Sequence, residues 1–204
     1  MKRAPSLNVE CIYAHNADAG EVGMRKVIVS NLMSLDGFFE SPDQKLDWCV
    51  VDEEFFEYAK DMLRGADTLL FGRKTYQHMA NYWPTAPADE IENRMNNLSK
   101  IVFSRTLQSA EWKNSTLVKS DAAEEISKLK QLPGKDMVIL GSASLLASLL
   151  GQRGLIDEYR VILNPVLLGS GKPLFQDVKE RLRLKLSRTK LFGSGVVVLY
   201  YQSA

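Results

Sequence analysis

Hydrophobic residues follow two alternating patterns along the chain: short unbroken apolar runs, and stripes that return every three or four positions. The unbroken runs are typical of buried strands, and the stripes are typical of amphipathic helices. Strands are predicted over residues 26–32, 68–71, 100–104, 116–118, 137–140 and 158–163. Helices are predicted between them, over 52–64 and about 74–82, around 91–98, after 121 and around 145–150. Strands that alternate with helices in this way favour a mostly parallel sheet.

Capping residues set the ends of two predicted helices. Asp52 can accept a hydrogen bond at the start of the first helix, and Gly65 follows its last residue at the usual C′ position. Asp121 and Glu124 form a capping-box pattern at the start of a later helix.

The last third of the chain has a different pattern. Leu182, Leu184 and Leu186 alternate strictly with polar residues, which predicts a strand with one solvent-facing side. A glycine-rich turn at 192–195 then leads into an apolar strand over 196–201. Two strands joined in this way predict an antiparallel hairpin. The predicted fold is α/β, with a mostly parallel mixed central sheet and a C-terminal antiparallel hairpin.

The first 23 residues show no sustained period and no apolar stretch of the kind found in secretory signals. We expect residues 1–23 to be a poorly ordered extension, with a lid or an oligomerisation arm as the alternative, and residues 24–204 to form one domain.

Composition narrows the class of protein. The 204 residues are 45% hydrophobic and 25% charged, with a net charge of +1, so neither nucleic acid nor an anionic membrane is favoured as the main partner. The two cysteines lack metal-ligand spacing, and only two histidines, His15 and His78, are present. No metal site is predicted, and a cytoplasmic location is expected.

Two common nucleotide-binding motifs are absent. No G-x-G-x-x-G follows the first strand. The segment Gly169-Ser-Gly-Lys172 resembles the end of a P-loop, but Val166 replaces the earlier glycine and Pro173 the required hydroxyl residue.

Three predicted strands instead end in small, polar or cationic residues. These residues are Gly72, Arg73, Lys74 and Thr75, then Ser104 and Arg105, and finally Gly141, Ser142 and Ala143. Parallel strands bring their carboxyl ends to one edge of the sheet, where ligands of such folds bind. Cations, hydroxyls and a helix N-terminus together suit a ligand with several phosphates. Taken singly, each turn is also compatible with an ordinary solvated loop.

These residues belong to motifs that resemble the dihydrofolate-reductase-like fold, and most closely the reductase domain of bacterial riboflavin-biosynthesis deaminase-reductases. The resemblance covers residues 25–204, and its motifs occur in the family's order: 34-SLDG-37, 66-ADTLLFGRKTY-76, 82-YWP-84, 100-KIVFSRTL-107, 140-LGSASL-145, 155-LIDEY-159 and 164-NPVLLGSGK-172. The resemblance implies a three-layer fold.

The resemblance also implies NADPH as the hydride donor. Gly72, Arg73, Lys74 and Thr75 would then lie along the cofactor phosphates, and Ser104 and Arg105 near the 2′-phosphate. Gly141, Ser142 and Ala143 would form a turn under the pyrophosphate and nicotinamide. Ser142 stands where folate reductases have the second glycine of a pair, which favours the riboflavin-type branch.

Candidate substrate residues come from other segments. Asp36 and Asp52 are the candidate catalytic carboxylates, although Asp36 can also form a turn and Asp52 can cap its helix. Trp48 and Trp83 could stack on a flat heterocycle or belong to the core. The other predicted substrate-binding residues are Gly37, Gly171 and Lys172, the last of which could also be a solvated lysine.

The resulting hypothesis is an NADPH-dependent reductase of a small pyrimidine- or pterin-like substrate, most like 5-amino-6-(5-phosphoribosylamino)uracil reductase. The zinc-deaminase signatures of the bifunctional relatives are absent. A dihydrofolate reductase and a non-catalytic NADP-binding module are the alternatives. A homodimer is expected from the family, with the strands over 182–191 and 196–201 as a possible partner surface.

Overall fold

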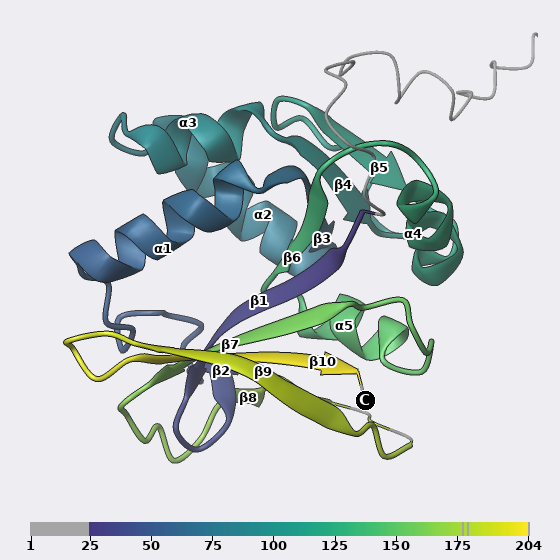
Figure 1. The fold of residues 1–204 in the computed structure, drawn as a ribbon. Coiled ribbons are helices and arrows are strands. Elements are labelled where there is room, and N and C mark those ends of the chain that lie inside the picture. Colours follow the sequence, from purple (N-terminus) through teal and green to yellow (C-terminus); the bar gives the residue numbers. More distant parts are fainter. Residues whose placement is uncertain (1–24, 177, 179, 204) are drawn as a thin grey trace, which may run out of the picture.

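The computed structural model describes residues 25–176, 178 and 180–203, which form an α/β fold of three layers (Figure 1). The predicted extension, residues 1–23, lies outside the described residues. The strands are β1 (Val27–Ser34), β2 (Phe38–Glu40), β3 (Ala66–Gly72), β4 (Ser99–Phe103), β5 (Ser115–Val118), β6 (Asp136–Leu140), β7 (Glu158–Asn164), β8 (Lys172–Pro173), β9 (Leu184–Leu191) and β10 (Val197–Ser203). The helices are α1 (Glu53–Arg64), α2 (Arg73–Tyr82), α3 (Glu90–Asn97), α4 (Ala122–Lys130) and α5 (Ala143–Leu149), with a 3₁₀ turn η2 (Trp83–Thr85).

The central sheet has eight strands in the order β5-β4-β3-β6-β1-β7-β10-β9. Every pairing from β5 across to β7 is parallel, and β10 runs antiparallel to both β7 and β9. The predicted α/β class, the mostly parallel sheet and the C-terminal antiparallel hairpin are therefore confirmed. A small separate sheet pairs β2 with β8, and strands of three and two residues are too short for a periodic pattern to predict.

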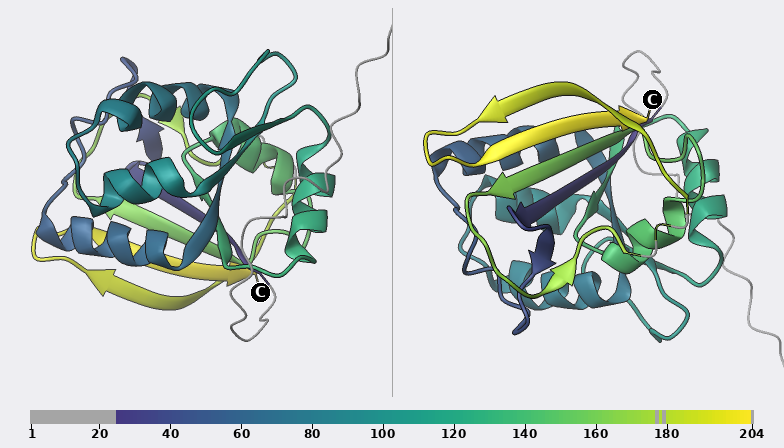
Figure 2. Two further views of the ribbon diagram at one scale, coloured as in Figure 1. Left: turned by 90° about the horizontal axis from the view of Figure 1, so that it is seen from above. Right: turned by 90° about the horizontal axis from the view of Figure 1, so that it is seen from below.

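The two faces of the sheet bury different sets of residues because side chains alternate along each strand. On one face, Val27 and Val29 of β1 pack with α4 and α5, where Leu146 is fully buried. On the other face, Ile28 packs with α1, α2 and α3. The views along the sheet show helices on both sides of it (Figure 2).

The predicted helix caps are largely confirmed. The Asp52 carboxylate accepts from the Phe55 amide at 2.8 Å, and the Asp121 carboxylate accepts from the amides of Ala123 and Glu124. Gly65 differs from the prediction: it is the C-cap itself, with a right-handed φ of −75°. The chain passes straight from Gly65 into β3, so no left-handed residue is needed to reverse it.

The expectation of one solvent-facing side on the penultimate strand was wrong. Strand β9 lies at the edge of the sheet and is exposed along most of its length, with Leu186 47% and Leu191 70% exposed. Leu182 and Leu184 pack partly against the core cluster that contains α4 and α5, whereas Leu186, farther along the strand, stays exposed. Its use as a partner surface stays a prediction.

Among the described residues, no helix combines the length and the apolar character that crossing a membrane requires.

One lysine is part of the core. Lys100 of β4 has no exposed surface, and its ammonium donates to the carbonyl oxygens of Asn96, Leu98 and Lys113 at 2.8–2.9 Å. These contacts join the C-terminal end of α3 to the end of the β4–β5 loop. Burial lowers the pKa of Lys100 to about 7, and the nearby charge of Lys113 adds to this shift. The three carbonyls oppose it, because only the ammonium form has three N–H donors.

Replacing Lys100 with Met is expected to destabilise the fold by about 1–3 kcal/mol, because it leaves buried carbonyls without donors. The lowered folded-state pKa means that the unfolded chain binds more protons between pH 7 and about 10. The free energy of unfolding of the wild type should therefore rise over this range relative to Lys100→Met. Urea unfolding at several pH values measures both effects. The exposed Lys119→Met is the matched control, and equal stability of the two variants would contradict the assigned role.

Candidate functional site

The turns predicted to share one rim do lie along one edge of the sheet. Strands β4, β3 and β6 are adjacent and parallel, so the residues after Phe103, at Gly72 and after Leu140 all lie at the carboxyl edge. Strand β1 neighbours β6 and brings Ser34 and Asp36 to the same edge. The predicted cofactor residues and Asp36 are thus brought to a common rim by topology.

Two of these turns are joined by direct contacts. The backbone N–H of Gly72 donates to the Ser142 hydroxyl at 3.0 Å. Gly141 packs so closely on Thr75 that a Cβ at residue 141 would lie 3.1 Å from the Thr75 methyl. The turn after β3 and the turn after β6 therefore form one unit.

Ser142 has an unusual conformation for its residue type. It lies in the left-handed region with φ 63° and ψ 52°, directly after Gly141 at φ 61°. Non-glycine residues adopt this region at a cost of about 1–2 kcal/mol. The side chain makes no capping bond to its own helix and instead binds Gly72. Ser142 thus has an unfavourable backbone conformation, and its hydroxyl forms a hydrogen bond that links the two loops.

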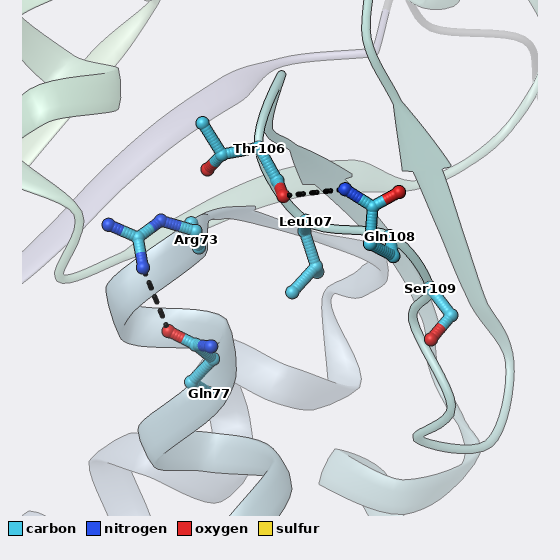
Figure 3. Close-up of a pocket in the computed structure, with 6 residues that line it drawn as sticks. All are labelled: Arg73, Gln77, Thr106, Leu107, Gln108 and Ser109. Carbon is cyan, nitrogen blue, oxygen red and sulfur yellow. Dashed lines mark hydrogen bonds between the residues drawn. The ribbon is translucent and has the colours of Figure 1, made fainter.

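Arg73 faces an open groove at the start of α2. A hollow of about 520 Å³ is lined by Arg73 and Gln77 on one side and by residues 106–109 on the other (Figure 3). Arg73 is exposed, and its guanidinium reaches Gln77 at 3.5 Å. Gly72, the N-cap of α2, supplies no side-chain cap, so the helix N-terminus offers free amides at this point.

The loop that forms the opposite side of the groove is folded by Ser104. Its hydroxyl accepts from the amides of Thr106 and Leu107 at 3.2 and 3.0 Å. Arg105 and Lys74 are exposed, and neither side chain forms a hydrogen bond or ion pair with another described residue. Arg73 is thus the cation that lines this groove, and Lys74 and Arg105 are its neighbours in sequence on the two sides. None of the three forms an ion pair with a carboxylate of the described residues.

Asp36 is held firmly beside the β7–β8 loop. Its carboxylate accepts from the Ser34 hydroxyl at 2.6 Å and from the amides of Leu168 and Gly169 at 3.2 and 2.7 Å. The Ser34 hydroxyl and, after it, these amides lower the pKa of Asp36. The group is an ionised acceptor at neutral pH, and it attaches the segment containing Gly171 and Lys172 to the end of β1.

Two glycines in this region are required for different reasons, one for its backbone conformation and the other for the lack of space around it. Gly37 has φ +90°, and Gly171 lies so close to the Glu40 carbonyl and the Phe38 side chain that a Cβ would collide. Lys172 pairs with Glu40 in the small sheet and lies 5.5 Å from the centre of the Phe39 ring.

The other predicted substrate residues are more widely distributed. Asp52 caps α1, and its pKa is lowered by the Ser194 hydroxyl and the Phe55 amide. The Trp48 indole donates to the Lys45 carbonyl, and that of Trp83 contacts the Met79 sulfur. Trp83 follows α2, about 15 Å from Arg73 by the helical rise, so it lies apart from the rim. A substrate role for these three residues stays a prediction.

Several groove residues could have been found from their spacing but were not predicted. Gln77 follows Arg73 by four positions and so shares its helix face, while residues 106–109 directly follow Arg105. Among the described residues, no group of three or more His, Cys, Asp or Glu side chains could hold a metal ion.

This geometry is accompanied by a sequence match over most of the chain. Residues 25–198 match the family described as the RibD C-terminal domain. The chain belongs to the RibD C-terminal domain family. The chain is also similar to the uncharacterized protein YyaP of Bacillus subtilis (strain 168), with 38% identity over 181 residues, covering 87% of this chain and 94% of YyaP.

Solved structures share the fold. A putative riboflavin biosynthesis protein from Shewanella sp. PV-4 has a TM-score of 0.69 at 24% identity, covering 88% of this chain and 99% of the other. A deaminase and 5-amino-6-(5-phosphoribosylamino)uracil reductase from Thermotoga maritima has a TM-score of 0.65 at 14% identity, covering 89% of this chain and 57% of that one. Enterococcus faecalis dihydrofolate reductase, solved with NADP(H), has a TM-score of 0.59 at 15% identity, covering 87% and 96%. At these identities the likeness shows the fold, which is dihydrofolate-reductase-like as predicted.

The bond between the two turns gives a stability prediction. Ser142→Ala removes the acceptor for Gly72 but keeps a side chain in the left-handed region, so we expect a loss of about 1–2 kcal/mol. Ser142→Gly loses the same bond but relieves the backbone cost, so its loss should be smaller. Denaturant unfolding compares the two variants, with the exposed Ser144→Ala as control. If Ser142→Ala matched the control, the hydroxyl would have no bridging role.

Proposed function

We propose that the chain is an NADPH-dependent reductase of a small pyrimidine- or pterin-like substrate, most like 5-amino-6-(5-phosphoribosylamino)uracil reductase. The main support is one observation: two joined turns and a groove lined by Arg73, which forms no ion pair with a described residue, lie together on the carboxyl edge of the sheet. The family match supports the reductase class, and the structurally similar Thermotoga maritima protein is described as a reductase of that substrate.

The residues at the rim fit the chemistry of a phosphorylated nicotinamide nucleotide. Arg73 and Arg105 offer forked guanidinium donors, which suit a phosphate dianion. Lys74 and the free amides at the start of α2 suit a pyrophosphate. The close packing of Gly141 on Thr75 keeps the turn after β6 beside the start of α2, where the phosphates are proposed to bind.

The substrate side of the proposal depends on the loop that Asp36 holds. NADPH, when bound, would supply a hydride to the substrate. The two amides bonded to Asp36 fix the start of 168–172, and Lys172 follows within the same segment, where its ammonium could meet a substrate phosphate. Asp36 accepts hydrogen bonds and is ionised, so its proposed part is to position this loop.

Two alternative functions are a dihydrofolate reductase and a non-catalytic NADP-binding module. A dihydrofolate reductase is favoured by the shared fold, whereas Ser142 in the turn after β6 favours the riboflavin-type branch. A non-catalytic NADP-binding module would use the same rim without turnover.

The cofactor proposal predicts a strong preference for NADPH over NADH. Arg105→Ala should weaken NADPH binding roughly tenfold or more, through loss of charge-assisted bonds to the 2′-phosphate, and leave NADH binding nearly unchanged. Arg73→Ala, which removes a cation from the phosphates that both nucleotides share, should weaken the binding of both. Calorimetric or fluorescence titration with each nucleotide measures this. Arg153→Ala, an exposed arginine outside the groove, is the control.

The possible results separate the functions. Equal affinity of the wild type for the two nucleotides would argue against the 2′-phosphate assignment. NADPH binding without oxidation in the presence of 5-amino-6-(5-phosphoribosylamino)uracil or dihydrofolate would favour the binding module. Tight methotrexate binding would favour a dihydrofolate reductase.

The role of Asp36 gives a separate kinetic prediction. Asp36→Asn weakens the acceptor for Leu168 and Gly169, so KM for the uracil substrate should rise roughly tenfold while NADPH affinity stays near the wild-type value. Steady-state rates at saturating NADPH measure the change. Asp89→Asn, which still caps α3 and has no assigned part in the site, is the matched variant with little expected effect. A fall in kcat at unchanged KM would instead assign Asp36 to proton transfer.

A further inference from the structure

A buried tryptophan lies behind the loop that forms one side of the groove. Trp112 is 6% exposed and is packed between Phe71 and Tyr76, with each ring centre 6.2 Å away. Its indole N–H donates to the Asn96 side-chain carbonyl at 2.7 Å, and the Lys100 ammonium lies 4.3 Å from its ring centre. The ring is therefore fixed by β3, α2, α3 and β4 together.

One hydrogen bond from this tryptophan joins the two sides of the groove. The backbone N–H of Trp112 donates to the Tyr76 hydroxyl at 2.9 Å. Tyr76 lies on α2, three positions after Arg73, and Trp112 lies three positions after Ser109 in the loop. The helix that presents Arg73 is thus bonded to the loop that faces it.

The hollow beside this bond continues the groove. A second concavity of about 450 Å³ is lined by Tyr76, Gln77, Ser109 and Trp112 among others, and it shares Gln77 and Ser109 with the hollow at Arg73. A shift of the loop would therefore change both hollows at once.

We propose that Tyr76 and Trp112, held from behind by Lys100, are positioning residues that fix residues 106–109 opposite Arg73 and so set the groove's affinity for a phosphorylated nucleotide. The inference rests on the proposed function for the identity of that ligand.

The contacts among Tyr76, Trp112 and Lys100 form a junction between α2 and the loop, and several ionisable groups surround it. Lys113 of the loop is the charge nearest to Lys100, Glu92 of α3 accepts from Asn96, and Tyr76 comes from α2. Strands β3 and β5 contribute Leu69 and Ser115 beside Lys100, neither of which titrates. The Lys100 ammonium faces the indole ring directly, and burial lowers its pKa to about 7, so the emission of Trp112 is the signal expected to follow its protonation.

The test removes one hydroxyl and keeps the ring. Tyr76→Phe abolishes the acceptor for the Trp112 amide, and Tyr82→Phe, an exposed tyrosine on the same helix, is the matched control. Without ligand, amide hydrogen exchange of residues 106–109 should be several times faster in Tyr76→Phe than in the control. Equal exchange in the two variants would overturn the proposal.

A double-mutant cycle, measured by NADPH affinity, then tests whether Tyr76 acts on the groove through Arg73. Tyr76→Phe should raise the NADPH dissociation constant roughly fivefold, and its effect should shrink or vanish in an Arg73→Ala background, because both changes disturb one contact. Fully additive effects would overturn the positioning role. If the wild type bound no NADPH, the proposed function would fail, while the exchange experiment would still decide the role of the junction.

A spectroscopic signal separates positioning from general loss of structure. In a protein with Trp48 and Trp83 replaced by Phe, Trp112 emission should change with pH around 7 and lose that change in Lys100→Met. Emission independent of pH in both proteins would show that Lys100 does not act on this ring.

Discussion

The hydrogen bond from the Gly72 amide to the Ser142 hydroxyl holds together the two loops on which the site depends. Strands β3 and β6 are already neighbours, so the sheet brings their ends close, but it does not fix the conformation of the turns that follow. A hydroxyl in the left-handed region reaches across from one turn to the other. The cationic start of α2 and the glycine-rich start of α5 are positioned through this bond.

The order of the strands explains why residues far apart in sequence meet at this place. Parallel strands direct each following turn to the same edge, and the sheet order puts β6 between β3 and β1. Asp36, after β1, then reaches the loop 168–172, which arrives from β7 on the other side of β1. One carboxylate therefore links the first strand of the domain to its last third.

Much of this arrangement could be predicted from the sequence, because the apolar runs are short and their ends are marked by glycine, aspartate or proline. The parallel sheet, the caps of α1 and α4 and the shared rim all follow from such local signals. What could not be predicted depends on contacts between distant segments. The Trp112 bond to Tyr76 spans 36 positions, and the three carbonyls around Lys100 come from a helix end and a loop. An apolar run that contains a lysine gives no sign that the ammonium is buried. The positions of Trp48 and Trp83 likewise depend on tertiary packing.

The exposed edge strand β9 has a consequence for the solubility of the protein. The outer side of an edge strand has free backbone N–H and C=O groups that can pair with another chain. Exposed apolar residues such as Leu186 and Leu191 add to the tendency to aggregate. Lys185, Arg188 and Lys190 lie on the same strand, with Arg188 over the Tyr200 ring and Lys190 over Phe192. Two such edges that approached each other would bring like charges together before any backbone bond could form. The strand thus resists fibrous aggregation through electrostatic repulsion, while its cations still shield aromatic rings of the core from water.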